Sequence, residues 1–170
     1  MFLFGHLGLT AGAVAAYNAR AKTPVDLRWA LPLSLLPDLV DKPTALAYSH
    51  VFHNHTRLFG HSLVFSAAVL LALVLGKRRA AVATWAACAG HLVLDRIWEP
   101  VNRWALLWPF GGRSEAMPPI FQRWFESLVQ PYNLGGELAG LAVLGWLVAR
   151  HRLYQRDRAA RFVATGLLEA

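Results

Sequence analysis

The chain has 170 residues, of which 56% are hydrophobic and only 16% are charged. Soluble domains usually carry about 25% charged residues, so this composition, with a mean hydropathy of +0.36, argues against a soluble domain and for an integral membrane protein. The net charge of +7 does not indicate nucleic-acid binding, because most Lys and Arg residues fall between apolar stretches. The single cysteine, Cys88, excludes an internal disulfide and a cysteine-rich zinc site.

Apolar stretches in five parts of the chain approach the roughly 20 residues that a membrane-spanning helix needs. They cover residues 2–18, 24–40, 58–76, 80–98 and 133–150. The second opens with a helix start signal, Thr23 as a cap and Pro24 at the first helical position. No positive charge precedes the first stretch, so we expect a retained helix and not a cleaved signal. The sequence therefore predicts an all-α fold, a polytopic bundle of about five transmembrane helices that forms one domain over residues 1–170.

Basic residues mark one side of this predicted bundle. They follow the first, third and fifth stretches: Arg20, Lys22, Lys77, Arg78, Arg79, Arg150, Arg152, Arg156, Arg158 and Arg161. Positive residues face the cytoplasm in membrane proteins. We therefore expect a multi-pass protein of the plasma (inner) membrane with its N-terminus outside and its C-terminus in the cytoplasm.

Residues 117–132, between the fourth and fifth stretches, combine polar residues with apolar pairs repeated every four residues. The pairs are Ile120 and Phe121, Trp124 and Phe125, and Leu128 and Val129. This spacing is typical of an amphipathic helix that lies in a membrane interface. We expect such a helix at the outer face, in contact with membrane lipids.

Ionisable residues recur at one depth in the predicted spans. Each lies 12 to 16 residues from a basic residue or helix start on the inner side: His6, Asp38, His61, His91, Asp95 and Glu137. At 1.5 Å per residue this corresponds to a layer about 18–24 Å above the cytoplasmic boundary. Because ionisable groups are costly inside a membrane, their shared depth indicates a functional site near the outer surface.

Within that layer, His91 and Asp95 stand four residues apart and therefore share one helical face. Alone, such a pair is more often a hydrogen-bonded pair than a metal site. Together with nearby donors it forms a mixed nitrogen and oxygen set suited to zinc, or to manganese or iron. The candidate ligands for one or two divalent ions are His6, Asp38, Asp41, His61, His91 and Asp95.

Other polar residues have open interpretations. Arg57 is a candidate to neutralise a phosphate, and Glu137 is a candidate catalytic acid or base that could instead pair with an arginine. His50, His53 and His55 fall in a polar outer loop and are expected to be solvated, with His55 as a reserve ligand.

Several short motifs follow one another in a distinctive order. They are Gly5-His6-Leu7, Leu35-Leu36-Pro37-Asp38, Arg57-Leu58-Phe59-Gly60-His61-Ser62-Leu63, Gly90-His91-Leu92-Val93-Leu94-Asp95 and Leu107-Trp108-Pro109-Phe110. In these motifs, over about residues 1–112, the chain resembles the YdjM-like family of membrane-bound metal-dependent hydrolases. That family commonly reads Pro-Asp-x-Asp-His, whereas here Asp41 is displaced by one residue and followed by Lys42. A more distant similarity is to zinc-dependent phospholipase C and P1-type nucleases.

This resemblance implies a metal-dependent hydrolase whose ligands include Asp38, His61, His91 and Asp95. A site just below the headgroups suits a phospholipid or a lipid-linked phosphate ester as substrate. Two alternatives remain: a non-enzymatic membrane protein that binds or transports a divalent metal ion, and a polar cluster that only locks the helices together.

Overall fold

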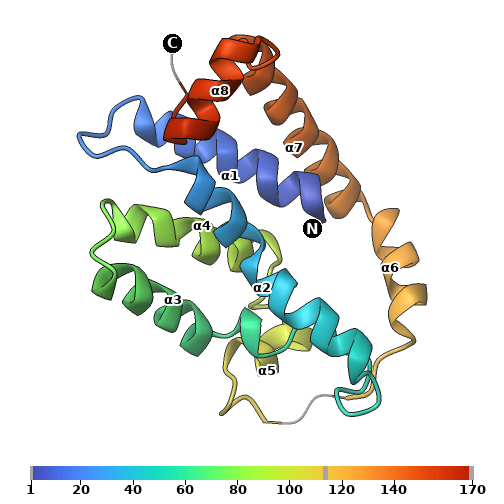
Figure 1. Ribbon diagram of the computed structural model, residues 1–170. Helices are drawn as coiled ribbons and strands as arrows, with labels where there is room; N and C mark the ends of the chain where they lie inside the picture. Colours follow the sequence, from blue (N-terminus) through green and yellow to red (C-terminus); the bar gives the residue numbers. More distant parts are fainter. Residues whose placement is uncertain (1, 113–114, 169–170) are drawn as a thin grey trace.

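The computed structural model describes residues 2–112 and 115–168, and within them every regular element is a helix. In chain order the elements are α1 (Leu3–Asn18), α2 (Leu27–Ala47), η1 (Phe59–His61), α3 (Leu63–Leu75), α4 (Ala81–Leu94), η2 (Pro100–Asn102), α5 (Arg103–Leu106), α6 (Ile120–Leu128), α7 (Pro131–Arg150) and α8 (Arg156–Thr165). The predicted all-α fold is confirmed. Figure 1 shows α1 and α7 side by side, with α2 crossing between them and the α3–α4 pair.

Local sequence signals set the ends of these helices. The Asp26 side chain accepts a hydrogen bond from the backbone N–H of Arg28 and so caps the start of α2. The Ser62 hydroxyl accepts from the N–H of Phe65 and starts α3 in the same way. Pro131 occupies the first turn of α7, where its missing N–H costs nothing. The starts of α2, α3 and α7 are therefore encoded locally.

Glycines let α1 and α7 come together closely. A Cβ atom added at Gly8 would overlap the backbone of Gly140, and one added at Gly140 would overlap the carbonyl of Phe4. Close backbone approach through small residues is the usual way in which helices associate without a large apolar side-chain interface. The α1–α7 contact therefore fixes the start of α7 beside the start of α1.

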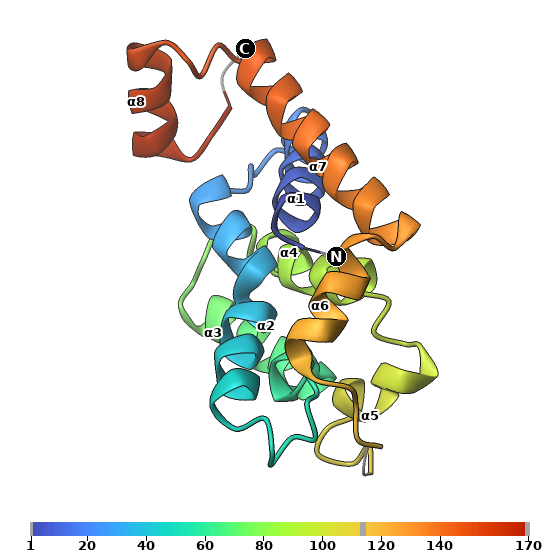
Figure 2. The ribbon, with the colours of Figure 1, turned by 90° about the vertical axis from the view of Figure 1, so that its right-hand side faces the viewer.

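Apolar clusters hold the rest of the bundle, and two of them join helices from distant parts of the chain. The larger one, which includes Ala11, Ala30 and Leu147, joins α1, α2, α4 and α7. In the smaller one, Ile120 of α6 packs with Ala45 and Leu58, at the end of α2 and just before η1. Figure 2 shows α6 lying across this end of the molecule, directly before α7. The helix predicted over residues 117–132 is therefore present in shorter form, as Ile120–Leu128.

Among the described residues, α7 is the one helix that is both long and apolar enough to cross a membrane. α3 and α4 are apolar but have only 13 and 14 residues. The Ser62 cap delays the start of α3, and α4 ends at Asp95, so both are shorter than the predicted spans 58–76 and 80–98. The predicted five-span bundle is thus not confirmed by helix length and composition.

We predict that Gly140→Ala destabilises the protein, because the new methyl group meets the backbone of α1, which cannot move aside as a side chain can. Overpacking of this kind typically costs about 1–3 kcal/mol. Gly145→Ala, in the same helix, is the matched control, since nothing lies within 4 Å of a Cβ at that position. The thermal unfolding midpoint of detergent-purified protein should fall for the first variant and not for the second. Equal midpoints would contradict the close α1–α7 contact.

Candidate metal centre

Four donor side chains from three elements converge near the end of the bundle that α6 covers. Asp38 comes from α2, His61 from η1, His91 from α4, and Asp95 from the residue that ends α4. One ligand atom from each lies within 4.8 Å of the other three. All four side chains are at least mostly buried, and the two histidines are fully buried. This group is called the four-donor cluster below.

The spacing of the donor atoms fits one small ion. His61 Nε2 lies 3.1 Å from His91 Nε2, 3.7 Å from Asp38 Oδ1 and 3.5 Å from Asp95 Oδ2. His91 Nε2 lies 3.8 Å from Asp38 Oδ1 and 4.0 Å from Asp95 Oδ2. Ligand bonds of about 2.0–2.1 Å in a tetrahedron put neighbouring donors about 3.3 Å apart. The five separations of 3.1–4.0 Å bracket this value, so around an ion the carboxylate oxygens would move inward and the two imidazole nitrogens slightly apart.

Both imidazole rings point a lone pair into the cluster. His91 Nδ1 lies 2.7 Å from the carbonyl oxygen of Ser34, and His61 Nδ1 lies 2.7 Å from Asp41 Oδ2. These oxygens only accept, so each Nδ1 carries the proton and donates it. In the neutral rings the two Nε2 lone pairs then face one another. A cation between the two Nε2 atoms would remove the repulsion between their lone pairs. Histidines that bind a metal commonly donate a hydrogen bond from their other ring nitrogen, as both rings do here through Nδ1.

The two carboxylates are held in a similar way. Asp38 turns Oδ1 toward the histidines, while its Oδ2 accepts a 2.6 Å hydrogen bond from Lys42 Nζ. Asp95 turns Oδ2 toward them and accepts a 2.8 Å hydrogen bond on it from Arg57 Nε. Each of the four donors is thus oriented by a partner outside the cluster, and such partners tune a metal site as well as orient it.

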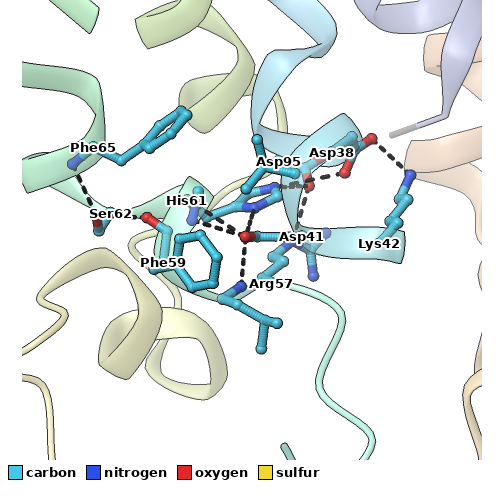
Figure 3. A network of polar contacts seen from close by, with 12 residues as sticks. Asp38, Asp41, Lys42, Arg57, Phe59, His61, Ser62, Phe65 and Asp95 are labelled. Carbon is cyan, nitrogen blue, oxygen red and sulfur yellow. Dashed lines mark hydrogen bonds and ion pairs between the residues drawn. The ribbon is translucent and has the colours of Figure 1, made fainter. Parts of the chain in front are cut away.

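Asp41, predicted as a ligand, lies behind His61 instead of beside the other donors (Figure 3). Its Oδ2 accepts hydrogen bonds from the N–H groups of Leu58 and His61, and its Oδ1 accepts from Gly60. The whole carboxylate is therefore engaged in shaping η1 and in orienting the His61 ring. A Cβ at Gly60 would lie 2.7 Å from Asp41 Oδ1 and 2.9 Å from the Pro37 carbonyl oxygen, so this approach needs glycine.

His6, also predicted as a ligand, lies next to the four-donor cluster but outside it. Its Nε2 is 3.2 Å from Asp95 Oδ1, the oxygen that faces away from the other donors. Its ring stacks on His91 with 3.9 Å between ring centroids. His6 Nδ1 is buried without a hydrogen-bond partner among the residues that the structure describes. His6 therefore positions Asp95 and His91.

The two residues predicted to be catalytic lie in different places. Arg57 contacts the cluster through Asp95 and also donates to Asn102 Oδ1 at 3.3 Å. Glu137 accepts hydrogen bonds from the backbone N–H groups of Phe2, Phe4 and Gly5. These are first-turn N–H groups of α1, so the Glu137 carboxylate stabilises the start of that helix.

The outer-loop histidines do not join the cluster. His50 and His53 are exposed. His55 is buried, with its Nε2 2.7 Å from the Glu115 carbonyl oxygen and its ring edge-on to Trp104. Burial lowers the pKa of His55, which keeps this ring neutral.

A small cleft of about 50 Å³ opens beside Asp38 and Asp95. Three basic side chains from different segments line it: Lys42, Arg57 and Arg123. Lys42 was not predicted to take part, although its spacing of four residues from Asp38 on one helix is a signal for such a pair. Arg123 belongs to α6, and nothing in its sequence position identifies the cleft.

Asp41→Asn should weaken metal binding about 10–100-fold, because it removes the charge behind His61 while keeping a similar shape. The measurement is the dissociation constant for zinc of detergent-purified protein, by competition with a chelator. Asp157→Asn, at an exposed ion pair on α8, is the control and should change nothing. An unchanged constant in Asp41→Asn protein that unfolds at the normal temperature would contradict this orienting role.

Gly60→Ala should also weaken zinc binding, since the added methyl group pushes η1 away from Asp41 and displaces His61. Gly90→Ala, immediately before His91, is its matched control because no atom lies within 4 Å of that Cβ. The same competition assay distinguishes them. Equal affinities for the two variants would show that η1 does not need this close approach.

Comparison with known proteins identifies the family. Neither the search of curated proteins nor that of solved structures found a match. The family of YdjM inner membrane proteins matches residues 1–163, nearly the whole chain and well beyond the motifs in its first two thirds. The chain therefore belongs to the YdjM inner membrane protein family.

Proposed function

We propose that this protein is a membrane-embedded hydrolase that uses a divalent metal ion to cleave a phospholipid or a lipid-linked phosphate ester. The observation that carries the proposal is the four-donor cluster, in which every donor is pre-oriented and which opens onto a cleft lined by basic side chains. Asp38, His61, His91 and Asp95 would hold the ion. Two imidazoles and two carboxylates favour zinc, with manganese or iron as alternatives.

When bound, such an ion would acidify a coordinated water and polarise the bond to be cleaved. The chain's own residues would do the rest. Arg57 and Lys42 stand on the cleft side of the two carboxylates, where a guanidinium and an ammonium can hold phosphate oxygens. Asp41 and His6 would keep the ligands in place. The Glu137 carboxylate accepts hydrogen bonds from backbone N–H groups at the start of α1, so its contacts lend no support to an acid or base role.

Charge supports an anionic substrate. The centre and its cleft contain three carboxylates and three basic groups, which balance one another: Asp38, Asp41 and Asp95 with Lys42, Arg57 and Arg123. A divalent ion would leave this region with an excess of two positive charges. A phosphate ester supplies compensating negative charge.

The site would lie near the outer face of the inner membrane. The start of α1, the end of α2 and the start of α7 gather at the end of the bundle that holds the cluster, whereas the basic residues follow α1, α3 and α7 at their other ends. The positive-inside rule would put those other ends in the cytoplasm. This is the basis for proposing a multi-pass protein with its N-terminus outside and its C-terminus inside.

We expect zinc-loaded wild-type protein to hydrolyse at least one member of a panel of phospholipids and lipid-linked phosphates. His91→Ala should lose at least a hundredfold in rate, because it removes a metal ligand. Arg57→Gln, assayed at a zinc concentration that saturates its site, should hydrolyse more slowly, because the phosphate loses a guanidinium partner. His50→Ala, in an exposed loop, is the control.

Two outcomes of that assay would contradict hydrolysis. Stoichiometric metal without turnover on any phosphate or other ester would favour a metal-binding or transport protein, which uptake by vesicles would then test. A lack of stoichiometric metal would favour a purely structural polar cluster.

A further inference from the structure

The helix α6 leads almost directly into α7, because α6 ends at Leu128 and α7 begins at Pro131. α7 is long and apolar enough to span a membrane, and the family is one of inner membrane proteins. The first turn of α7 must then lie close to a membrane surface. Asn133 Nδ2 donates to the Ser127 carbonyl oxygen at 2.9 Å and fixes the bend between the two helices. A bilayer that α7 crosses would therefore meet α6 at its interface.

Three sides of α6 differ in their surroundings. Phe121 and Phe125 are 62% and 70% exposed, and Val129, directly after the helix, is 75% exposed. Gln122 and Glu126 form a second exposed side and are joined by a 2.9 Å hydrogen bond. An apolar side next to a polar one on a short helix at an interface is the pattern of a helix seated in a phospholipid surface.

The third side of α6 forms a wall of the cleft beside the metal centre. Arg123, Trp124 and Ser127 line the cleft together with Arg57, Asp38 and Asp95. Arg123 is fixed there by a hydrogen bond of 3.0 Å from Nη1 to the Asn54 carbonyl oxygen. Ile120 anchors the helix, with only 5% of its surface exposed. One short helix thus connects the cleft with the apolar exposed side.

We infer that α6 is a membrane-docked wall of the cleft, and that the phosphate group enters from the phospholipid leaflet around the start of α7, still attached to its lipid. This inference rests on the proposed function and deepens it, since it selects lipid-borne over water-soluble phosphate esters. Phe121 and Phe125 hold α6 in the leaflet. Arg123 lies about 160° around the helix from these two side chains, on the side away from the lipid tails. There it meets phosphate oxygens on their way to Arg57 and the four-donor cluster.

The membrane position of α6 is tested without reference to activity. Single cysteines at positions 121, 125, 122 and 126, in a Cys88→Ala background, are spin-labelled in vesicles of phosphatidylethanolamine and phosphatidylglycerol. Labels at 121 and 125 should be more accessible to oxygen, and labels at 122 and 126 more accessible to a water-soluble nickel chelate. The same accessibility at all four positions would overturn the docking of α6.

The route of the substrate is tested by a ratio of rates. Phosphatidylglycerol in vesicles and the soluble ester bis(p-nitrophenyl) phosphate are compared for wild type, F121N/F125N and the water-side control Q122A/E126A. The ratio of lipid to soluble hydrolysis should fall at least tenfold in F121N/F125N and stay constant in the control. An unchanged ratio with active enzyme would overturn delivery through α6 but leave the hydrolase proposal intact. A wild type that cleaves neither substrate, nor any of the phosphate panel, would overturn the hydrolase and with it the lipid route.

Discussion

The structure depends on one constraint, which is that buried charges among apolar helices must be compensated. Asp38, Asp41 and Asp95 would each be costly in this environment if left alone. Each is instead matched by a specific partner, Lys42 for Asp38, the N–H groups of η1 for Asp41, and Arg57 with His6 for Asp95. These partners come from different helices and loops. The arrangement of the helix ends therefore follows from the need to bring them together.

The same compensation brings two imidazole nitrogens of the four-donor cluster into direct contact. His61 and His91 have their Nδ1 protons committed to Asp41 and to Ser34, so their Nε2 atoms meet at 3.1 Å in a fully buried place. A hydrogen bond between them would require one ring to be protonated or to change its tautomer. A metal ion satisfies both nitrogens and the two neighbouring carboxylate oxygens at once. The four side chains of this cluster could therefore hold a metal ion.

The depth of the polar residues could be predicted from the sequence because helix rise and the basic markers are both regular. Counting along the spans brought Asp38, His61, His91 and Asp95 to one level, and the structure brings them together. Counting residues gives a depth but cannot decide whether Asp38 or Asp41 faces the two histidines. Asp41 follows Asp38 by three residues and shares its side of α2, but η1 folds against it and takes up its oxygens. Counting also could not show where Glu137 lies within the layer, because its place depends on the close packing of α1 on α7 through Gly8 and Gly140.

Helix lengths were predicted less well, because apolar composition does not show where a helix starts or stops. Ser62 and Asp95 divide continuous apolar sequence into helix and turn, and two of the four candidate ligands, His61 and Asp95, lie at these turns. In this chain, a helix that starts late or ends early at a polar residue therefore lies next to the candidate site.

The most direct test of the metal centre is the spectrum of the cobalt(II)-substituted protein, together with X-ray absorption at the cobalt edge. One ion per chain should show the visible bands of a four- or five-coordinate site, with a shell of the four side-chain donors and at most one water at about 2.0–2.1 Å. A weak octahedral spectrum with mostly water ligands, or the same spectrum in the His61→Ala/His91→Ala protein, would contradict a centre built from these four side chains.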